Sequence, residues 1–160
     1  MPRTGKIKPR ITPPDPLYGS QRLTKLINGV MKSGKKSVAQ KQVYSALDII
    51  KQKSKQEEPL RVFESAIKHI TPPMEVRSRR VGGATYQVPM PVRGNRGFSL
   101  AIRWLVTESR NRSNNKYHSF ADKLAAEIID AANGEGGAVD RKHNTQRQAE
   151  ANKAFAHFRW

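Results

Sequence analysis

The chain has 160 residues, and its 30 lysines and arginines outnumber 13 acids to give a formal net charge of +17. One domain with extensions suits this length, and self-repulsion at this charge favours a polyanionic partner, either nucleic acid or an acidic membrane. Without cysteine, disulfides and thiolate zinc sites are excluded. Since the four histidines also lack ligand spacing, we expect no metal and no cofactor.

No apolar run reaches the roughly 20 residues of a membrane span, and the first residues lack the apolar segment of a secretory signal. We therefore expect a cytoplasmic protein without a membrane partner. Residues 1–19 contain five prolines, which exclude helix and predict an extended basic tail. Its candidate contacts with a polyanion are Arg3, Lys6, Lys8 and Arg10, with a solvated terminus as the alternative.

Apolar periodicity predicts a mainly α, single-domain bundle of about six helices over residues 20–154. The first helix follows the N-cap Ser20 and ends at Ser33 and Gly34, the second runs to about Ser54, and the third begins at Pro59. A fourth follows Gly97, a fifth ends at Asn133, and Gly136 to Ala154 is helix-compatible with a thin apolar stripe. The predicted core residues are Leu23, Leu26, Ile27, Val30, Met31, Ala39, Val43, Ala46, Leu47, Ile50, Leu60, Phe63, Ile67, Ile70, Phe98, Ala101, Ile102, Leu105, Phe120, Leu124, Ala125, Ile128, Ile129 and Ala132.

The first two predicted helices are strongly basic, because no acid occurs between Arg22 and Leu47. Lys35 and Lys36 open the second helix, where a cation opposes the helix dipole. That placement favours phosphate contact over an ordinary charged face, and we add Lys25 to the same candidate surface.

A two-stranded arm is predicted at about 75–92, between the third and fourth helices, with Gly82 and Gly83 as its turn. An isolated two-stranded hairpin is only marginally stable in water, so we expect a partner to order this arm. Its arginines suit phosphate recognition better than lysines because the guanidinium is a planar fork. The candidates are Arg77, Arg79, Arg80, Arg93 and Arg96.

The C-terminal third supplies further cations, namely Arg110, Arg112, Arg141 and Lys142. Trp104 lies beside a core stripe and is predicted to pack there. Residues 155–160 hold three aromatic residues, so we expect this end to dock on a partner or on the body of the protein. Its docking candidates are Phe155, His157, Phe158 and Trp160.

No nucleotide-binding, zinc-protease or nucleophile-elbow motif is present, so we expect no enzyme and no catalytic residues. A DNA-architectural protein with a β-arm is the main rival to an RNA-binding protein. Such arms wedge DNA with a proline at the tip, whereas this tip is Gly82 and Gly83. Cations pointing several ways suit irregular RNA, which we favour while DNA stays open.

Four separated motifs then add a resemblance. Lys35-Lys36-Ser37, the arm from Arg79 to Pro89, Ala101-Ile102-Arg103-Trp104 and the ending from Ala149 to Trp160 closely resemble bacterial-type small-subunit ribosomal protein seven. The resemblance implies a structural protein that binds the 3′ major domain of small-subunit rRNA and nucleates assembly of the head. It also implies a position near the exit-site tRNA and the mRNA, with ribosomal protein eleven as a neighbour.

Overall fold

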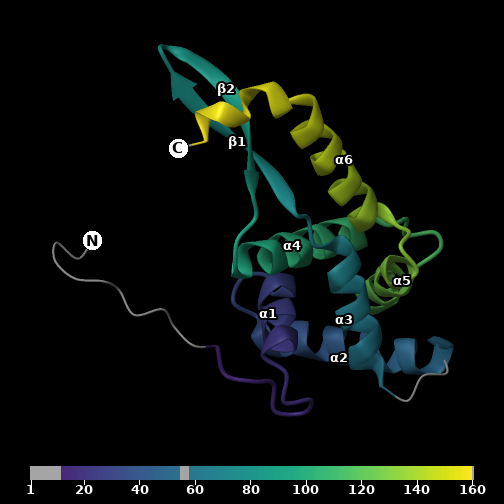
Figure 1. Cartoon of the computed structure of the whole chain (residues 1–160). Coiled ribbons are helices and arrows are strands. Elements are labelled where there is room, and N and C mark those ends of the chain that lie inside the picture. The colour runs from purple at the N-terminus through teal and green to yellow at the C-terminus, as the bar shows by residue number, and fades with distance from the viewer. Residues whose placement is uncertain (1–11, 55–57, 160) are drawn as a thin grey trace, which may run out of the picture.

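The computed structural model describes residues 12–54 and 58–159. These residues form six α-helices, one 3₁₀ helix and a two-stranded antiparallel hairpin that projects from the bundle (Figure 1). The predicted fold class is confirmed, including the place of the hairpin between the third and fourth helices. The elements are α1 (Gln21–Val30), α2 (Lys36–Ser54), α3 (Pro59–Ile70), β1 (Met74–Val81), β2 (Ala84–Pro91), α4 (Asn95–Asn111), α5 (Phe120–Ala132), α6 (Gly137–Ala151) and η1 (Lys153–Phe158).

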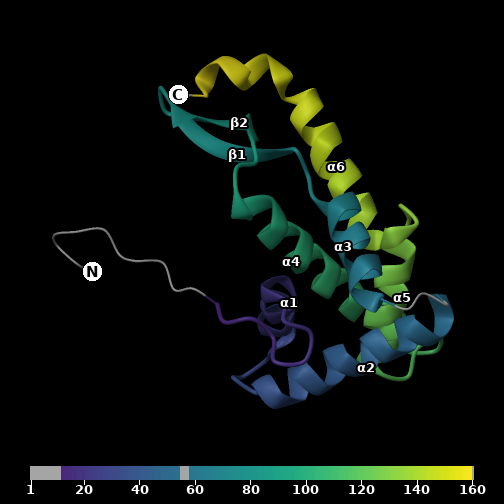
Figure 2. The ribbon, with the colours of Figure 1, turned by 60° about the horizontal axis from the view of Figure 1, so that its bottom comes forward.

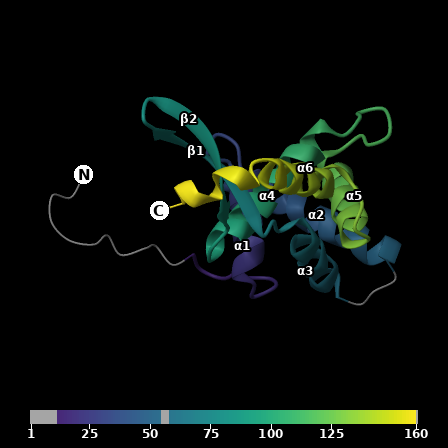
Figure 3. The same ribbon diagram turned by 45° about the horizontal axis from the view of Figure 1, so that its top comes forward.

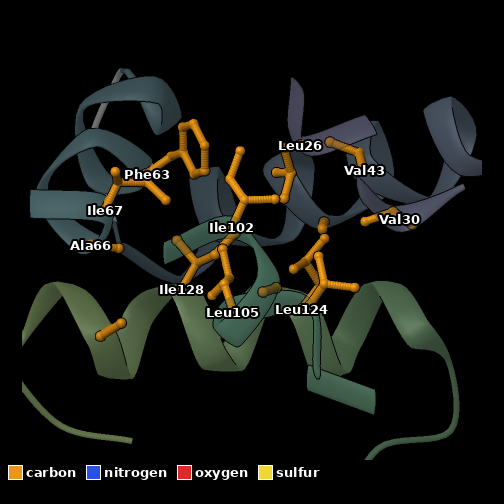
Figure 4. Packing of buried hydrophobic residues seen from close by; sticks show 14 of the residues in the cluster. Leu26, Val30, Val43, Phe63, Ala66, Ile67, Ile102, Leu105, Leu124 and Ile128 are labelled. Atoms are coloured by element: carbon orange, nitrogen blue, oxygen red, sulfur yellow. The ribbon is translucent and has the colours of Figure 1, made fainter. Parts of the chain in front are cut away.

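Helix α5 lies at the centre of the bundle, in contact with α2, α3, α4 and α6. Its small alanines allow neighbours to approach from several sides, and eight of its residues are buried. Leu124 and Ile128 of α5 meet Phe63 from α3 and Leu105 from α4 in one core (Figure 4). Trp104 packs against this core as predicted. Several predicted core residues are only partly buried at its edge, namely Met31, Leu60, Phe98, Phe120, Ile129 and Ala132.

Local capping explains where several helices begin. The Ser20 hydroxyl accepts a hydrogen bond from the Leu23 N–H, which confirms the predicted N-cap of α1. Ser119 and Asp122 form a reciprocal capping box at the start of α5. Pro59 occupies the first turn of α3, where its missing N–H costs no helical bond.

Two predicted boundaries are wrong. Helix α1 ends at Val30 instead of at Ser33 and Gly34, and Arg110 from α4 caps it there by donating a 3.0 Å hydrogen bond to the Val30 carbonyl. Helix α4 begins at Asn95, ahead of Gly97. The helix-compatible stretch from Gly136 to Ala154 contains α6, which ends at Ala151, and the start of η1 at Lys153.

The hairpin does not stand alone in the molecule. Its register pairs Arg79 with Tyr86 and Val81 with Ala84, and the φ angles of +58° at Gly82 and +90° at Gly83 permit the tight turn. Helix α6 contacts both strands, and η1 lies along β2 (Figures 1 and 3). The C-terminal part of the chain therefore supports the hairpin without an external partner.

Candidate nucleic-acid interface

The hairpin arginines are divided between two faces. Alternation along β1 places Arg77 and Arg79 on one face, which also carries Tyr86 of β2. Arg80 points to the other face and is exposed, while Arg79 is partly buried beside Tyr86. The hairpin thus presents cations on two sides, as the sequence analysis expected of a protein that binds an irregular polyanion.

A buried carboxylate orients two of these cations. Glu75 is 6% exposed and bonds to Arg77 through Nε at 2.6 Å and to Arg96 through Nη2 at 3.0 Å. Burial opposes ionisation of Glu75, but the hydrogen bonds from Arg96 and Arg77 outweigh it and lower the pKa of the carboxyl. Both arginine side chains stay about half exposed, at 51% for Arg77 and 46% for Arg96. They are held in place while still facing solvent.

The C-terminal aromatic residues fold back onto the hairpin. The ring of Tyr86 lies 5.2 Å from that of Phe155 and 5.1 Å from that of Phe158, centroid to centroid. The rings of His157 and Phe158 have centroids 3.9 Å apart and are tilted by 46°, and Trp160 lies outside the described residues. The C-terminal end was expected to dock either on a partner or on the body of the protein, and this contact is the second of these. We name the cluster of Tyr86, Phe155 and Phe158 the aromatic clasp.

A second basic surface lies at the start of the bundle. Lys35 ends the turn between α1 and α2, and Lys36 is the first residue of α2. Both are exposed, and neither side chain forms an ion pair in the described part of the chain. On α1, Lys25 lies over the ring of Phe98 at 5.5 Å, and Arg22 lies over it at 5.9 Å. In Figures 1 and 2, α4 lies between α1 and the hairpin, so the two basic surfaces flank one helix.

Besides Arg77 and Arg96, four further predicted RNA contacts form hydrogen bonds or ion pairs within the protein. Arg110 caps α1, Arg141 donates to Glu108 at 2.7 Å, and Lys142 donates to the His69 carbonyl at 2.7 Å. These three side chains lie at the surface or near it, and each retains further N–H groups that can donate to a ligand. Arg112 differs, because its side chain is only 16% exposed and bonds to both Glu127 and Asp130.

Arg112 is structural in this fold. Its Nε donates to Glu127 at 2.6 Å, and its Nη1 donates to the Tyr117 hydroxyl at 3.1 Å. Burial tends to lower the pKa of Arg112, but its hydrogen bonds to Asp130 and Glu127 raise it overall, so the group stays charged. We leave Arg112 out of the interface. No sequence signal indicated this structural role, because Glu127 and Asp130 lie 15 and 18 residues further along the chain, on another helix.

The tail cations Arg3, Lys6, Lys8 and Arg10 lie outside the described residues, but the anchor of the tail is visible. Asp15 is 3% exposed and accepts hydrogen bonds from the Tyr44 hydroxyl at 2.8 Å and from the N–H groups of Leu17 and Tyr18 at 3.2 Å. The sequence analysis gave Asp15 no role, because a single acid in a basic tail carries no signal of burial.

Comparison with known proteins decides the family. The family model described as ribosomal protein S7p/S5e matches residues 2–153. The chain belongs to the ribosomal protein S7p/S5e family. It is similar over all 160 residues, and over the full length of each relative, to proteins named small ribosomal subunit protein uS7. The identity is 58% with that of Thermoanaerobacter sp. (strain X514) and 57% with those of Thermomicrobium roseum and Carboxydothermus hydrogenoformans.

Family membership confirms the predicted resemblance and makes the chain a structural ribosomal protein with a role in translation. The S7p/S5e match extends over the hairpin and all six α-helices, and so over both basic surfaces. Among the described residues, no helix is long and apolar enough to cross a membrane.

Proposed function

We propose that this member of the S7p/S5e family is a primary binder of the 3′ major domain of small-subunit rRNA and that it nucleates assembly of the head. The observation that carries the proposal is the hairpin, where one buried carboxylate, Glu75, fixes Arg77 and Arg96 with half of each side chain still exposed. Preorganised guanidinium groups lose little side-chain entropy when they meet a phosphate.

The proposed interface has four parts. They are the tail cations, the turn carrying Lys35 and Lys36, the hairpin arginines, and Lys25 beside Phe98. Within the described residues, most of these groups lack an internal acid, so counterion release from RNA supplies much of the affinity. Base reading is minor in this proposal, because the cations are spread over several elements and form no single reading helix.

Duplex DNA is the rival ligand. The tip of the hairpin is Gly82 and Gly83, and its prolines Pro89 and Pro91 lie at the base of β2, paired with Val76 and Met74. A hairpin without an apolar wedge at its tip is poorly suited to opening base steps in the minor groove. RNA junctions need no such wedge, since their shape already exposes backbone from several directions.

Binding to a 3′-domain rRNA fragment and to duplex DNA over a salt series tests the proposal. We expect tighter binding to RNA at every salt concentration, and equal affinity for both would refute the RNA-specific function. Replacing Arg79 and Arg80 by alanine should weaken RNA binding and flatten its salt dependence while the circular-dichroism melt stays unchanged. Loss of the cooperative melt would instead mean that these arginines hold the fold.

The finer parts of the proposal concern the neighbours. We place the hairpin and the C-terminal end near the exit-site tRNA and the mRNA, with ribosomal protein eleven beside the aromatic clasp, in cytoplasmic ribosomes and with no enzymatic activity. Because the chain contains no cysteine, Thr85→Cys near the hairpin tip offers a single cross-linking position. Cross-links from assembled ribosomes to tRNA or mRNA are expected. Products confined to distant rRNA would contradict this placement.

A further inference from the structure

The base of the hairpin and the C-terminal end of the described chain enclose a hollow of about 400 Å³. Three arginines line it, Arg77 from β1, Arg93 after β2 and Arg159 after η1, and Met90 and Pro91 complete its wall. The arginines come from three segments that are far apart in the sequence. The sequence analysis placed Arg77 and Arg93 among the candidate contacts and gave Arg159 no role of its own.

The charge of this hollow is largely uncompensated. Arg77 shares Glu75 with Arg96, so one carboxylate serves two guanidinium groups. The side chains of Arg93 and Arg159 form no ion pair and no hydrogen bond within residues 12–54 and 58–159, and both residues are exposed. Converging guanidinium groups repel one another unless an anion lies between them. The arrangement therefore favours the binding of an anionic ligand in the hollow.

The aromatic clasp creates this arrangement. Phe155 and Phe158 pack against Tyr86, one residue of the hairpin face that also carries Arg77. Arg159 follows Phe158 directly, so the clasp delivers its guanidinium to the base of the hairpin. Arg159 therefore lines the hollow while the C-terminal end is docked in this way.

We propose that Arg77, Arg93 and Arg159 form a composite site for a backbone phosphate of rRNA, and that Arg159 is an rRNA-binding residue. A guanidinium binds a phosphate through two parallel N–H donors, and the apolar wall of Met90 and Pro91 suits the adjoining sugar. The inference rests on the proposed RNA-binding function and adds to it a residue and the segment that positions it. The aromatic clasp residues are positioning residues, since they act through Arg159.

Salt dependence of binding to the 3′-domain rRNA fragment tests the site. Each lost phosphate contact lowers the slope of log affinity against log salt by about 0.7–0.9. Because the site binds one phosphate, we expect a loss of up to this size for Arg159→Gln and a loss no larger than this for Arg93→Gln combined with Arg159→Gln. Arg61→Gln is the matched control, because it removes one arginine from the exposed surface pair with Glu58. It should leave the slope unchanged.

Further variants test the geometry of the site and the role of the aromatic clasp. Arg159→Lys keeps the charge without the fork and should recover the slope but only part of the affinity. Phe158→Ala, which loosens the aromatic clasp, should reproduce the loss seen with Arg159→Gln.

The proposal is overturned if Arg159→Gln and Arg61→Gln give the same slope. It is also overturned if Arg159→Gln leaves RNA binding intact but abolishes binding of a polyglutamate peptide, which would assign the pocket to an acidic protein segment. Equal wild-type affinity for RNA and duplex DNA is a different result, and it would remove the proposed function itself.

Discussion

Replacing Arg112 by methionine tests whether the buried ion cluster holds the C-terminal half of the fold. The side chain of Glu127 is only 2% exposed, and its two oxygens accept hydrogen bonds from Arg112 at 2.6 Å and from the Ala138 N–H at 2.9 Å. Glu127 thereby ties the end of α4 to the start of α6. Methionine keeps much of the volume of Arg112 but leaves a charged carboxylate buried without its cation.

Breaking a buried pair by removing one partner costs about 3–5 kcal/mol of unfolding free energy. At roughly 2–4 °C per kcal/mol for a chain of this size, Arg112→Met should lower the melting temperature by about 6–20 °C. The assay is thermal unfolding followed by circular dichroism, with urea unfolding to obtain the free energy. Arg61→Met removes an exposed pair with Glu58 and should cost no more than about 1 kcal/mol.

A double variant isolates the cause. Glu127→Gln added to Arg112→Met removes the stranded charge but keeps an oxygen for the Ala138 N–H, so it should recover a large part of the lost stability. The reasoning is refuted if Arg112→Met costs no more than Arg61→Met, or if the double variant is less stable than Arg112→Met alone. Below their melting temperatures, the Arg112 variants should bind rRNA as the wild type does.

Three further predictions concern local features. The hydrogen bonds from Ser119 lower the pKa of Asp122 in the capping box of α5. The ionised Asp122 therefore contributes its full stabilisation above the ordinary aspartate pKa of about 3.9, and this stabilisation is lost as pH falls through the pKa of Asp122 in the folded protein. Asp122→Asn should consequently reduce the fall of the melting temperature at acidic pH. A Cβ on Gly29 would lie 2.9 Å from Ile102 Cγ2, so Gly29→Ala should destabilise the protein by about 1 kcal/mol in urea unfolding, and should stabilise it in an Ile102→Ala background. Tyr86→Ala should open the aromatic clasp and speed limited proteolysis between α6 and the C-terminus, whereas Tyr86→Phe should not.

Local sequence signals predicted the elements well because their causes are local. Ser20 caps the helix that it begins, Pro59 occupies the first turn of the helix that it opens, and Gly82 with Gly83 closes a hairpin between adjacent strands. The spacing of apolar residues identified the buried faces for the same reason, because residues that repeat with the helical period lie on the one face of the helix that turns toward the core. These features follow from residues within one or two turns of each other.

Features fixed by distant partners could not be predicted in the same way. The end of α1 depends on Arg110, which lies 80 positions further along the chain. Arg159 joins the hairpin only because the aromatic clasp folds η1 back onto β2. For Glu75, a signal was present: residues two apart on a strand share a face, so a lone acid next to Arg77 could have indicated an ion pair.

The ratio of carboxylates to guanidinium groups distinguishes structural arginines from binding arginines in this protein. Arg112 meets two carboxylates, so its cluster has a formal charge of −1 and no attraction for phosphate. Glu75 meets two guanidinium groups, so its cluster has a formal charge of +1 and each arginine keeps about half of its surface open. Both clusters contain a buried carboxylate and both fix side-chain geometry. Only the second has positive charge left over, so in the proposed interface the buried Glu75 at the base of the hairpin serves RNA binding, whereas the buried Glu127 on α5 serves folding.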